Sequence, residues 1–488
     1  MRYVLGIGVF LILLGVFLAL TMREEPYDRM AFNPDDMQIP SELINPHGNI
    51  LWVSVEGLRP DHMGVYGYEN ITTPRIDSFA SESLVFERCY AQSTETYRSI
   101  ATMLTSQYPS AYPSGSIDDA GRGFRDCLYQ TDASFVACIR NAGHTTAAIV
   151  GSPLLKGEFG FSTGFDYYDD KPIVESDGSI RDRTTEETYM AAESWLSRNF
   201  KRPFFMFVHF PDPRGPYDAG PSNLKQLRML PSYTNPKTLV VAGNDIRPLN
   251  ALPAYHGKAG EQRSIGEMKR MYDAEIAEVD FYVGELLDTV SRLDISDETM
   301  VIISGAHGES LGEHSYYFAN GGITYRNLTH VPLIIHNPGN TGGHISDVVE
   351  GIDIMPTISG YLNTKNTPTF AGMNLLRFYE KNSLKYEYPA FSCWDAPTAI
   401  SVIKGDYELI NFDDNKYMLF HIVNDPDEIY NLYTENDPTA KELKMLLEIW
   451  NRQNREQALD KEIKEKYGPP SHKNPMIIPQ EVMRANPK

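Results

Sequence analysis

The stretch Asn49–Val55 reads Asn-Ile-Leu-Trp-Val-Ser-Val, and Glu56 and Gly57 follow it directly. It is short, apolar and rich in β-branched residues, which is typical of a strand that is buried on both faces. The glutamate and glycine at its end indicate that the chain leaves the sheet there in a loop. The stretch therefore predicts a central strand followed by a polar loop.

Similar apolar runs recur along the chain, with helical stretches between them. The clearest helix is predicted over 267–293, where apolar residues return at three- and four-residue steps and form one stripe. This alternation predicts an α/β fold, with a large, mostly parallel sheet sandwiched by helices. The other apolar runs are Thr145–Val150, Phe204–Phe210, Met300–Ser304 and Val331–His336.

Functional side chains of such sheets gather in the loops at the carboxyl ends of the strands. Three predicted loops carry carboxylate, imidazole or guanidinium groups, and we expect them to meet in one crevice. Arg59 and Asp61 in the first loop are expected to form a supporting ion pair. The three loops are residues 56–62, 211–217 and 305–309.

The charge balance restricts the partners. The 488 residues include 44 Lys and Arg against 65 Asp and Glu, which gives a net charge of −21. A chain this acidic repels a phosphate backbone, so nucleic acid is excluded as a partner. The four cysteines have no spacing typical of a zinc site, and their pairing stays open.

Residues 1–22 form an apolar segment without parallel in the chain. Val4–Leu20 contains no charged residue, and Tyr3–Met22 gives about 20 residues, or about 30 Å of helix, which is enough to cross a bilayer. We expect an N-terminal transmembrane anchor and a single-pass protein whose body lies outside the cytoplasm. The alternative is a cleaved signal peptide and a secreted protein.

Composition divides the rest of the chain into four parts. Short strand-like runs near the C-terminus, separated by turn residues, predict a small α+β subdomain with an antiparallel sheet and a closing helix over 442–453. The predicted parts are a proline-containing linker over 23–47, the main α/β domain over 48–368, the subdomain over 369–455 and a polar tail over 456–488.

The order of several motifs resembles the sulfatase branch of the alkaline phosphatase superfamily. The resemblance runs from about residue 48 to residue 452 and includes the segment around Asn49–Tyr68. It implies that branch's fold, but activity depends on a few site residues. The most characteristic further motifs are Tyr272–Ile276, His307–His314, His330–Ile335, Asp353–Thr357 and Asn424–Glu428.

The resemblance also implies a divalent metal, with a nucleophile bound to it. Matched position by position, Glu56, Thr96 and His307 are the expected metal ligands, and Thr96 is the expected nucleophile. Two other interpretations stay open. Thr96 is also a good helix N-cap, and His307 also fits a hydrogen-bonded loop histidine.

Departures from the family pattern limit the chemistry. Thr96, Arg98 and Ile100 replace the Cys or Ser, Pro and Arg of formylglycine sulfatases, which excludes that mechanism. Ala306 replaces a carboxylate ligand, so occupancy of the metal site is in doubt. Calcium and magnesium prefer six or more oxygens, whereas zinc or manganese tolerates the remaining set better.

Arg214 and Asn320 each stand where the family has a histidine. Neither side chain can donate a proton near neutral pH, so leaving-group protonation has lost its usual candidates. Both are expected to bind substrate, and Arg214 can clamp an anionic group.

Three functions follow from these residues. The first is a hydrolase for sulfate, phosphate or phosphonate esters that is impaired in catalysis, and the second is a non-catalytic protein that binds an anionic glycan or lipid head group. The third is a phosphoglycerol- or phosphoethanolamine-type transferase, although such enzymes usually carry several membrane spans.

Overall fold

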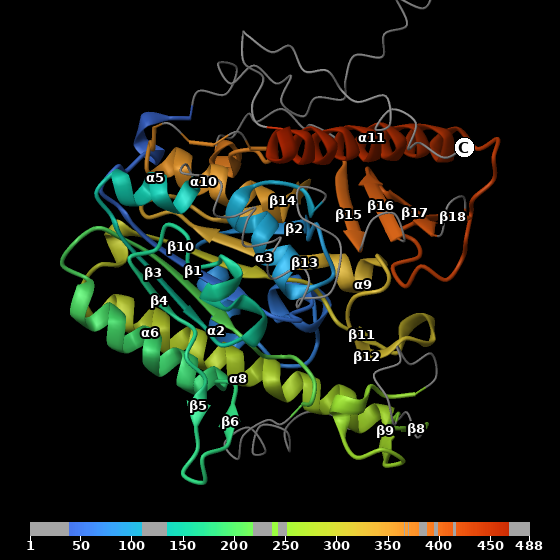
Figure 1. Ribbon diagram of the computed structural model, residues 1–488, viewed down its shortest axis with the longest axis horizontal. Helices are drawn as coiled ribbons and strands as arrows, with labels where there is room; N and C mark the ends of the chain where they lie inside the picture. Colours follow the sequence, from blue (N-terminus) through green and yellow to red (C-terminus); the bar gives the residue numbers. More distant parts are fainter. Residues whose placement is uncertain are drawn as a thin grey trace, which may run out of the picture.

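The computed structural model describes residues 39–109, 134–217, 237–242, 251–365, 367–368, 370–379, 388–394, 399–412 and 416–467. An eight-stranded sheet forms its centre, in the order β14-β2-β13-β10-β1-β7-β3-β4 (Figure 1). All neighbouring strands are parallel except where β13 pairs with β10 and β2, which confirms the predicted mostly parallel sheet. The strands are β1 (Asn49–Val55), β2 (Leu84–Tyr90), β3 (Thr145–Val150), β4 (Tyr167–Asp169), β7 (Phe204–Phe210), β10 (Thr299–Gly305), β13 (His330–His336) and β14 (Gly343–Glu350).

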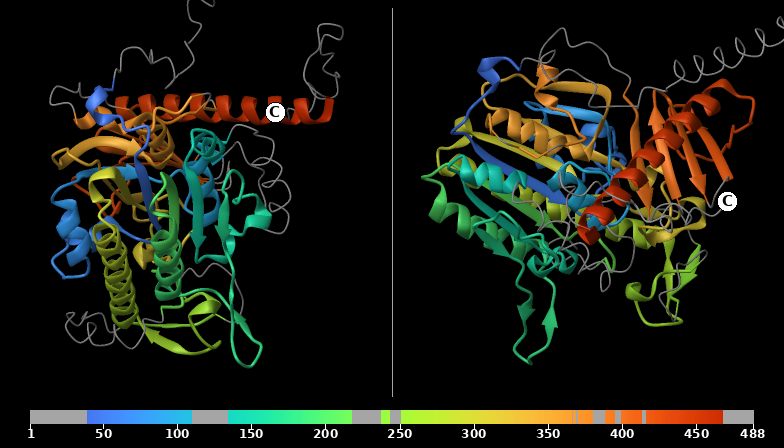
Figure 2. Two further views of the ribbon diagram at one scale, coloured as in Figure 1. Left: turned by 90° about the vertical axis from the view of Figure 1, so that its left-hand side faces the viewer. Right: turned by 45° about the horizontal axis from the view of Figure 1, so that its top comes forward.

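Helices cover both faces of this sheet, as Figures 1 and 2 show. Side chains of β1 alternate between the two cores: Ile50 and Trp52 pack on one face, and Leu51 and Val53 on the other. All seven residues of β1 are buried, as its composition predicts. The first face is covered by α3 (Thr96–Thr105), α5 (Phe135–Asn141) and α10 (Ile354–Tyr361), and the second by α2 (Pro74–Ala80), α6 (Thr185–Asn199) and α8 (Ile265–Arg292), which is the predicted long helix.

Short elements complete the main domain. They are three two-stranded antiparallel sheets and the short helix α9 (Arg326–Thr329), which lies just before β13. The strand pairs of these small sheets are β5 (Ile173–Val174) with β6 (Ile180–Arg181), β8 (Thr238–Val240) with β9 (Gln262–Ser264), and β11 (Ser310–Leu311) with β12 (Tyr317–Ala319).

The C-terminal subdomain is a four-stranded antiparallel sheet crossed by one long helix, α11 (Pro438–Tyr467) (Figure 2). The rings of Phe391 and Trp450 stack between sheet and helix, with centroids 5.1 Å apart. The predicted hairpins are confirmed, but α11 is longer than predicted, so the first part of the expected tail is helical. The strands are β15 (Ala390–Trp394), β16 (Ala399–Lys404), β17 (Tyr407–Phe412) and β18 (Lys416–His421).

The N-terminal predictions need two corrections. The folded body begins before residue 48, because Leu43 is buried in the core and Asn45 donates its backbone N–H to Tyr361 O at 2.8 Å. The single-pass membrane placement is contradicted, because none of the helices in the described ranges is long and apolar enough to cross a bilayer. The segment 1–22 itself lies outside those ranges.

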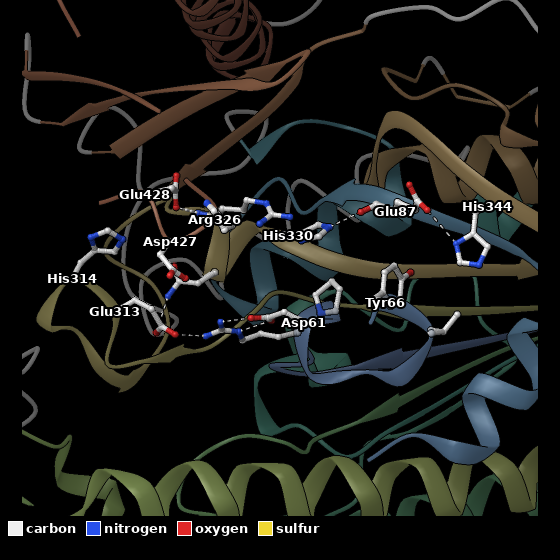
Figure 3. Close-up of a pocket in the computed structure, with 15 residues that line it drawn as sticks. Asp61, Tyr66, Glu87, Glu313, His314, Arg326, His330, His344, Asp427 and Glu428 are labelled. Carbon is white, nitrogen blue, oxygen red and sulfur yellow. Dashed lines mark hydrogen bonds and ion pairs between the residues drawn. The ribbon is translucent and has the colours of Figure 1, made fainter. Parts of the chain in front are cut away.

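A pair of buried carboxyl groups lies where the subdomain meets the main domain. Glu408 on β17 and Glu428 are both buried, and no residue in the described part of the chain gives either side-chain oxygen of Glu408 a hydrogen bond. Glu428 Oε2 accepts the backbone N–H of Arg326 at 2.8 Å, and Figure 3 shows these two residues side by side. Burial raises the pKa of Glu408 well above its usual range and that of Glu428 to about 7.

This pair predicts a pH-dependent stability. The pKa of Glu428 is raised on folding from an unfolded value near 4.3, so its contribution is complete below that value and is lost as the pH rises through about 7. We expect the melting temperature to fall between pH 5 and 8, and Glu428→Gln to flatten that fall. The exposed Glu435→Gln is the control, and a Glu428→Gln profile as steep as that of the unmodified protein would contradict the raised pKa of Glu428.

Candidate functional site

Three of the predicted loops meet in a cavity at the carboxyl ends of β1, β7 and β10. Because β1 pairs with both β7 and β10, the segments that follow these strands start side by side. The cavity has a volume of about 490 Å³. The three loops supply Glu56, Arg214 and Glu309 to its lining, and the start of α3 supplies Glu95 and Thr96. Tyr255 and Asn320, the residue that follows β12, complete the polar part of the lining.

Thr96 lies on the floor of this cavity, with two acceptors for its hydroxyl proton. Its Oγ1 is 2.6 Å from Glu56 Oε1 and 3.1 Å from His307 Nε2, and all three residues are buried. The N-cap interpretation is wrong, because Glu95 is the N-cap residue of α3 and Thr96 is its first helical residue. The threonine side chain therefore serves the cavity and not the helix end.

His307 presents an unprotonated nitrogen to Thr96. Its Nδ1 lies 2.7 Å from the carbonyl oxygen of Gly308, which can only accept, so Nδ1 carries the proton and Nε2 is the acceptor. Burial lowers the pKa of His307, although the charge of Glu56 opposes this shift. Asn320 Nδ2 also approaches Nε2, at 3.4 Å. The neutral imidazole is thus held in one orientation by the two flanking groups.

Glu56 is ionised although it is fully buried. Burial alone would raise its pKa, but Arg214 and the hydrogen bond from His209 lower that pKa to about 2. His209 Nε2 lies 3.2 Å from Glu56 Oε2, and its Nδ1 lies 3.2 Å from Ser54 Oγ. Sequence reasoning missed His209, although an imidazole inside an otherwise apolar strand was a visible signal.

Arg214 lies beside Glu56 without a hydrogen bond to it. Its Nε is 3.8 Å from Glu56 Oε1, and its Nη2 is 3.8 Å from Asp182 Oδ2. Both distances exceed hydrogen-bond length, and within the described ranges no residue accepts a hydrogen bond from this guanidinium. The charge of Glu56 raises the pKa of Arg214, and burial opposes the rise. Its N–H groups therefore remain available to an anion in the cavity.

Glu309 is a second carboxyl group that sequence reasoning left without a role. Tyr217 donates its hydroxyl to Glu309 Oε1 at 3.2 Å, while Oε2 is buried and has no partner in the described part of the chain. Burial raises the pKa of Glu309 to about 8, and the negative charge of Glu56 acts in the same direction. Near neutral pH, Glu56 is thus the ionised carboxylate of this pair and Glu309 the largely protonated one.

A second cavity, of about 550 Å³, lies on the outer side of the first loop (Figure 3). Its buried cation, Arg59, is already engaged: it binds Asp61 in a bidentate pair at 2.7 and 2.9 Å and Glu313 at 3.0 Å. The predicted Arg59–Asp61 pair is therefore confirmed. Further carboxylates, including Glu87 and Asp427, line the wall. The cavity at Thr96 holds the side chains that were expected to bind and attack an ester, so it is the candidate site.

Comparisons with known proteins agree with this location. Residues 48–364 match the family described as Sulfatase, which is more than half of the chain. The chain belongs to the sulfatase family. Residues 312–456 also match the family described as N-sulphoglucosamine sulphohydrolase, C-terminal. By this resemblance, the chain is grouped with the sulfuric ester hydrolases of the sulfatase family.

Individual members of the sulfatase family match over most of their length. An N-acetylglucosamine-6-O-sulfatase of Bacteroides thetaiotaomicron is 24% identical, over 83% of this chain and 86% of its own. A structure in complex with its substrate D-glucosamine-2-N,6-O-disulfate has a TM-score of 0.66 at 19% identity, over 86% of this chain and 100% of its own. The phosphonate monoester hydrolase of Agrobacterium radiobacter has a TM-score of 0.63 at 18% identity, over 84% and 96%. These structures share the fold.

The sulfatase family normally uses a divalent metal, but the residues present here fit one poorly. Gly57 and Ala306, which flank the cluster, supply no donor, and a Cβ at Gly57 would lie 2.1 Å from the carbonyl oxygen of Pro213. Both oxygens of Glu56 already have partners in Thr96 and His209. Among the described residues, no three His, Cys, Asp or Glu side chains are grouped to hold a metal ion.

Proposed function

We propose that this sulfatase-family protein binds sulfate, phosphate or phosphonate esters of an anionic glycan at Thr96 and hydrolyses them slowly. The observation that carries the proposal is the Thr96 hydroxyl, which has two proton acceptors, at 2.6 and 3.1 Å, in a cavity lined by Arg214. A hydroxyl that can lose its proton to a neighbouring base is a competent nucleophile. The disulfated glucosamine bound by a structural neighbour supports a sulfated glycan as ligand.

Hydrolysis would proceed in two steps. Thr96 Oγ1 attacks the sulfur or phosphorus atom, its proton passes to Glu56 or His307, and the alkoxide or phenoxide leaves with the bonding electron pair and takes a proton from solvent water. In the second step a water oxygen attacks the same sulfur or phosphorus atom, the bond to Thr96 Oγ1 breaks, Oγ1 takes back the proton from Glu56 or His307, and sulfate or phosphate is released. Arg214 and Asn320 cannot protonate the leaving group near neutral pH, and the free oxygen of the protonated Glu309 is buried, so aryl esters should react faster than sugar esters.

The second candidate is a protein that binds the same esters without turning them over. Four positions favour it. Gly57 and Ala306 add no metal ligand, and Arg214 and Asn320 are not acids. This candidate keeps the ligand class and gives up the nucleophilic step.

Substitution of Thr96 separates the two candidates. We expect Thr96→Ala to lower the turnover of 4-nitrophenyl sulfate, phosphate or phenylphosphonate by at least about a thousandfold, because it removes the attacking oxygen. Thr105→Ala on the same helix is the control, because Thr105 does not line the cavity and its hydroxyl donates to Ala101 O at 2.7 Å.

Mass spectrometry of a quenched reaction should find the added group on Thr96. Unchanged turnover in Thr96→Ala would remove Thr96 as the nucleophile. Ligand binding without turnover in the unmodified protein would favour the non-catalytic candidate.

A further inference from the structure

Arg214 is the cation beside the Glu56 carboxylate, whose negative charge a metal ion would be expected to neutralise. Glu56 is ionised and fully buried, and burying an unpaired carboxylate costs several kcal/mol. The guanidinium of Arg214, at 3.8 Å from Glu56 Oε1, is the closest permanent positive charge that the described residues supply. The imidazole of His307 is less readily protonated than a free one, because burial lowers its pKa. Arg214 therefore balances the carboxylate.

We propose that Arg214 supplies the positive charge that a divalent cation supplies in other sulfatases, so that the cavity binds a tetrahedral oxyanion without a metal. This inference rests on the proposed function and deepens it. It assigns the sulfate, phosphate or phosphonate group of the ester to the guanidinium and to the start of α3. A guanidinium is permanently charged and matches such an oxyanion with two parallel N–H groups.

The geometry of Arg214 leaves room for that ligand. Its Nε faces Glu56 Oε1, and neither this contact nor the one to Asp182 is short enough to be a hydrogen bond. The side chain is 28% exposed and lines the cavity, so a ligand can reach the remaining N–H groups. A bound oxyanion would contact the same guanidinium that faces Glu56, and this positive charge reduces the repulsion between the two negative charges.

The start of α3 supplies a second attraction for the same anion. Thr96 is the first residue of this ten-residue helix, so its backbone N–H has no partner in the preceding turn. The partial positive charge of a helix N-terminus favours anions within its first turn.

Calorimetric titration of the full chain with inorganic sulfate, with and without EDTA, tests the inference. We expect sulfate affinity to change less than about twofold on EDTA treatment. Arg214→Gln should lose at least about tenfold, and Arg214→Lys, which keeps the charge but not the planar fork, should lose less. Lys156→Gln, which removes an exposed cation outside the cavity lining, should bind as the unmodified chain does.

Two other outcomes have different meanings. If EDTA abolishes sulfate binding and added Ca²⁺, Mg²⁺ or Mn²⁺ restores it, the inference is wrong and the proposed function stands. If neither the metal-free nor the metal-loaded chain binds sulfate, phosphate or an aryl ester, both are wrong. Thermal melting of each variant shows whether it is folded, and Arg214→Lys decides the matter if Arg214→Gln unfolds.

Discussion

Replacing Glu56 by glutamine is expected to lower ester turnover by about two to three orders of magnitude while sulfate binds more tightly. Glutamine keeps the size of the side chain, but its neutral amide cannot take the Thr96 proton, and general-base catalysis typically contributes that much. The same change removes the carboxylate whose charge acts most strongly on Arg214, so more of the charge of Arg214 can act on a bound anion.

Measurement of kcat, KM and sulfate affinity checks both effects together. The exposed Glu158→Gln makes the same chemical change outside the cavity and serves as the control. Turnover equal to that of the unmodified protein would show that Glu56 does not accept the Thr96 proton. A weaker sulfate affinity would show that Glu56 helps to hold the anion, against the charge arrangement inferred above.

Removal of Arg59 is expected to destabilise the protein by about 3 kcal/mol. Breaking a buried ion pair by removing one partner costs about 3–5 kcal/mol, and the partial exposure of Asp61, at 59%, reduces this value. Arg59 also donates to Glu313 and to the backbone carbonyl of Glu309. Loss of Arg59 therefore leaves the Glu313 carboxylate without its cation and removes a hydrogen bond to the loop that carries His307.

Urea unfolding of Arg59→Ala measures this cost. Arg75→Ala is a matched control, because Arg75 also contacts two carboxylates, Glu285 and Asp288, but at the surface. Exposed pairs contribute about 0–1 kcal/mol, so we expect the two variants to differ clearly. Equal losses in both variants would mean that burial of the Arg59 pair adds nothing to stability.

The sheet and the meeting of the loops could be predicted from the sequence. Fully buried parallel strands carry an unbroken apolar pattern, and β1, β3 and β7 end at the predicted residues. Glu56 and His307 lie in loops that follow such strands, but the roles of Glu56, Thr96 and His307 were expected only because the chain resembles the sulfatase branch. The structure brings the three side chains together, with 4.0 Å or less between the contacting atoms.

The remaining features depend on three-dimensional contacts that the sequence does not display. His209 reaches Glu56 because β7 pairs with β1 in a register that sets it opposite Ser54. The protonation of Glu309 depends on burial, which a glutamate in a loop motif does not reveal. The sequence predicts a closing helix shorter than α11, because the charged segment after residue 455 is typical of a polar tail. The glutamate, lysine and alanine residues of that segment nevertheless favour a helix.

The crowding around Gly57 bears on how this site can change over evolutionary time. Any side chain at residue 57 would collide with the Pro213 carbonyl, and the left-handed backbone there, with φ at +67°, further disfavours one. An aspartate at residue 306 would enter a fully buried apolar position and require a partner for its charge. A stronger set of carboxylate ligands therefore requires the loop of Arg214 to move first. A single substitution to a carboxylate at residue 57 or 306 therefore brings either a steric clash or an unpaired buried charge.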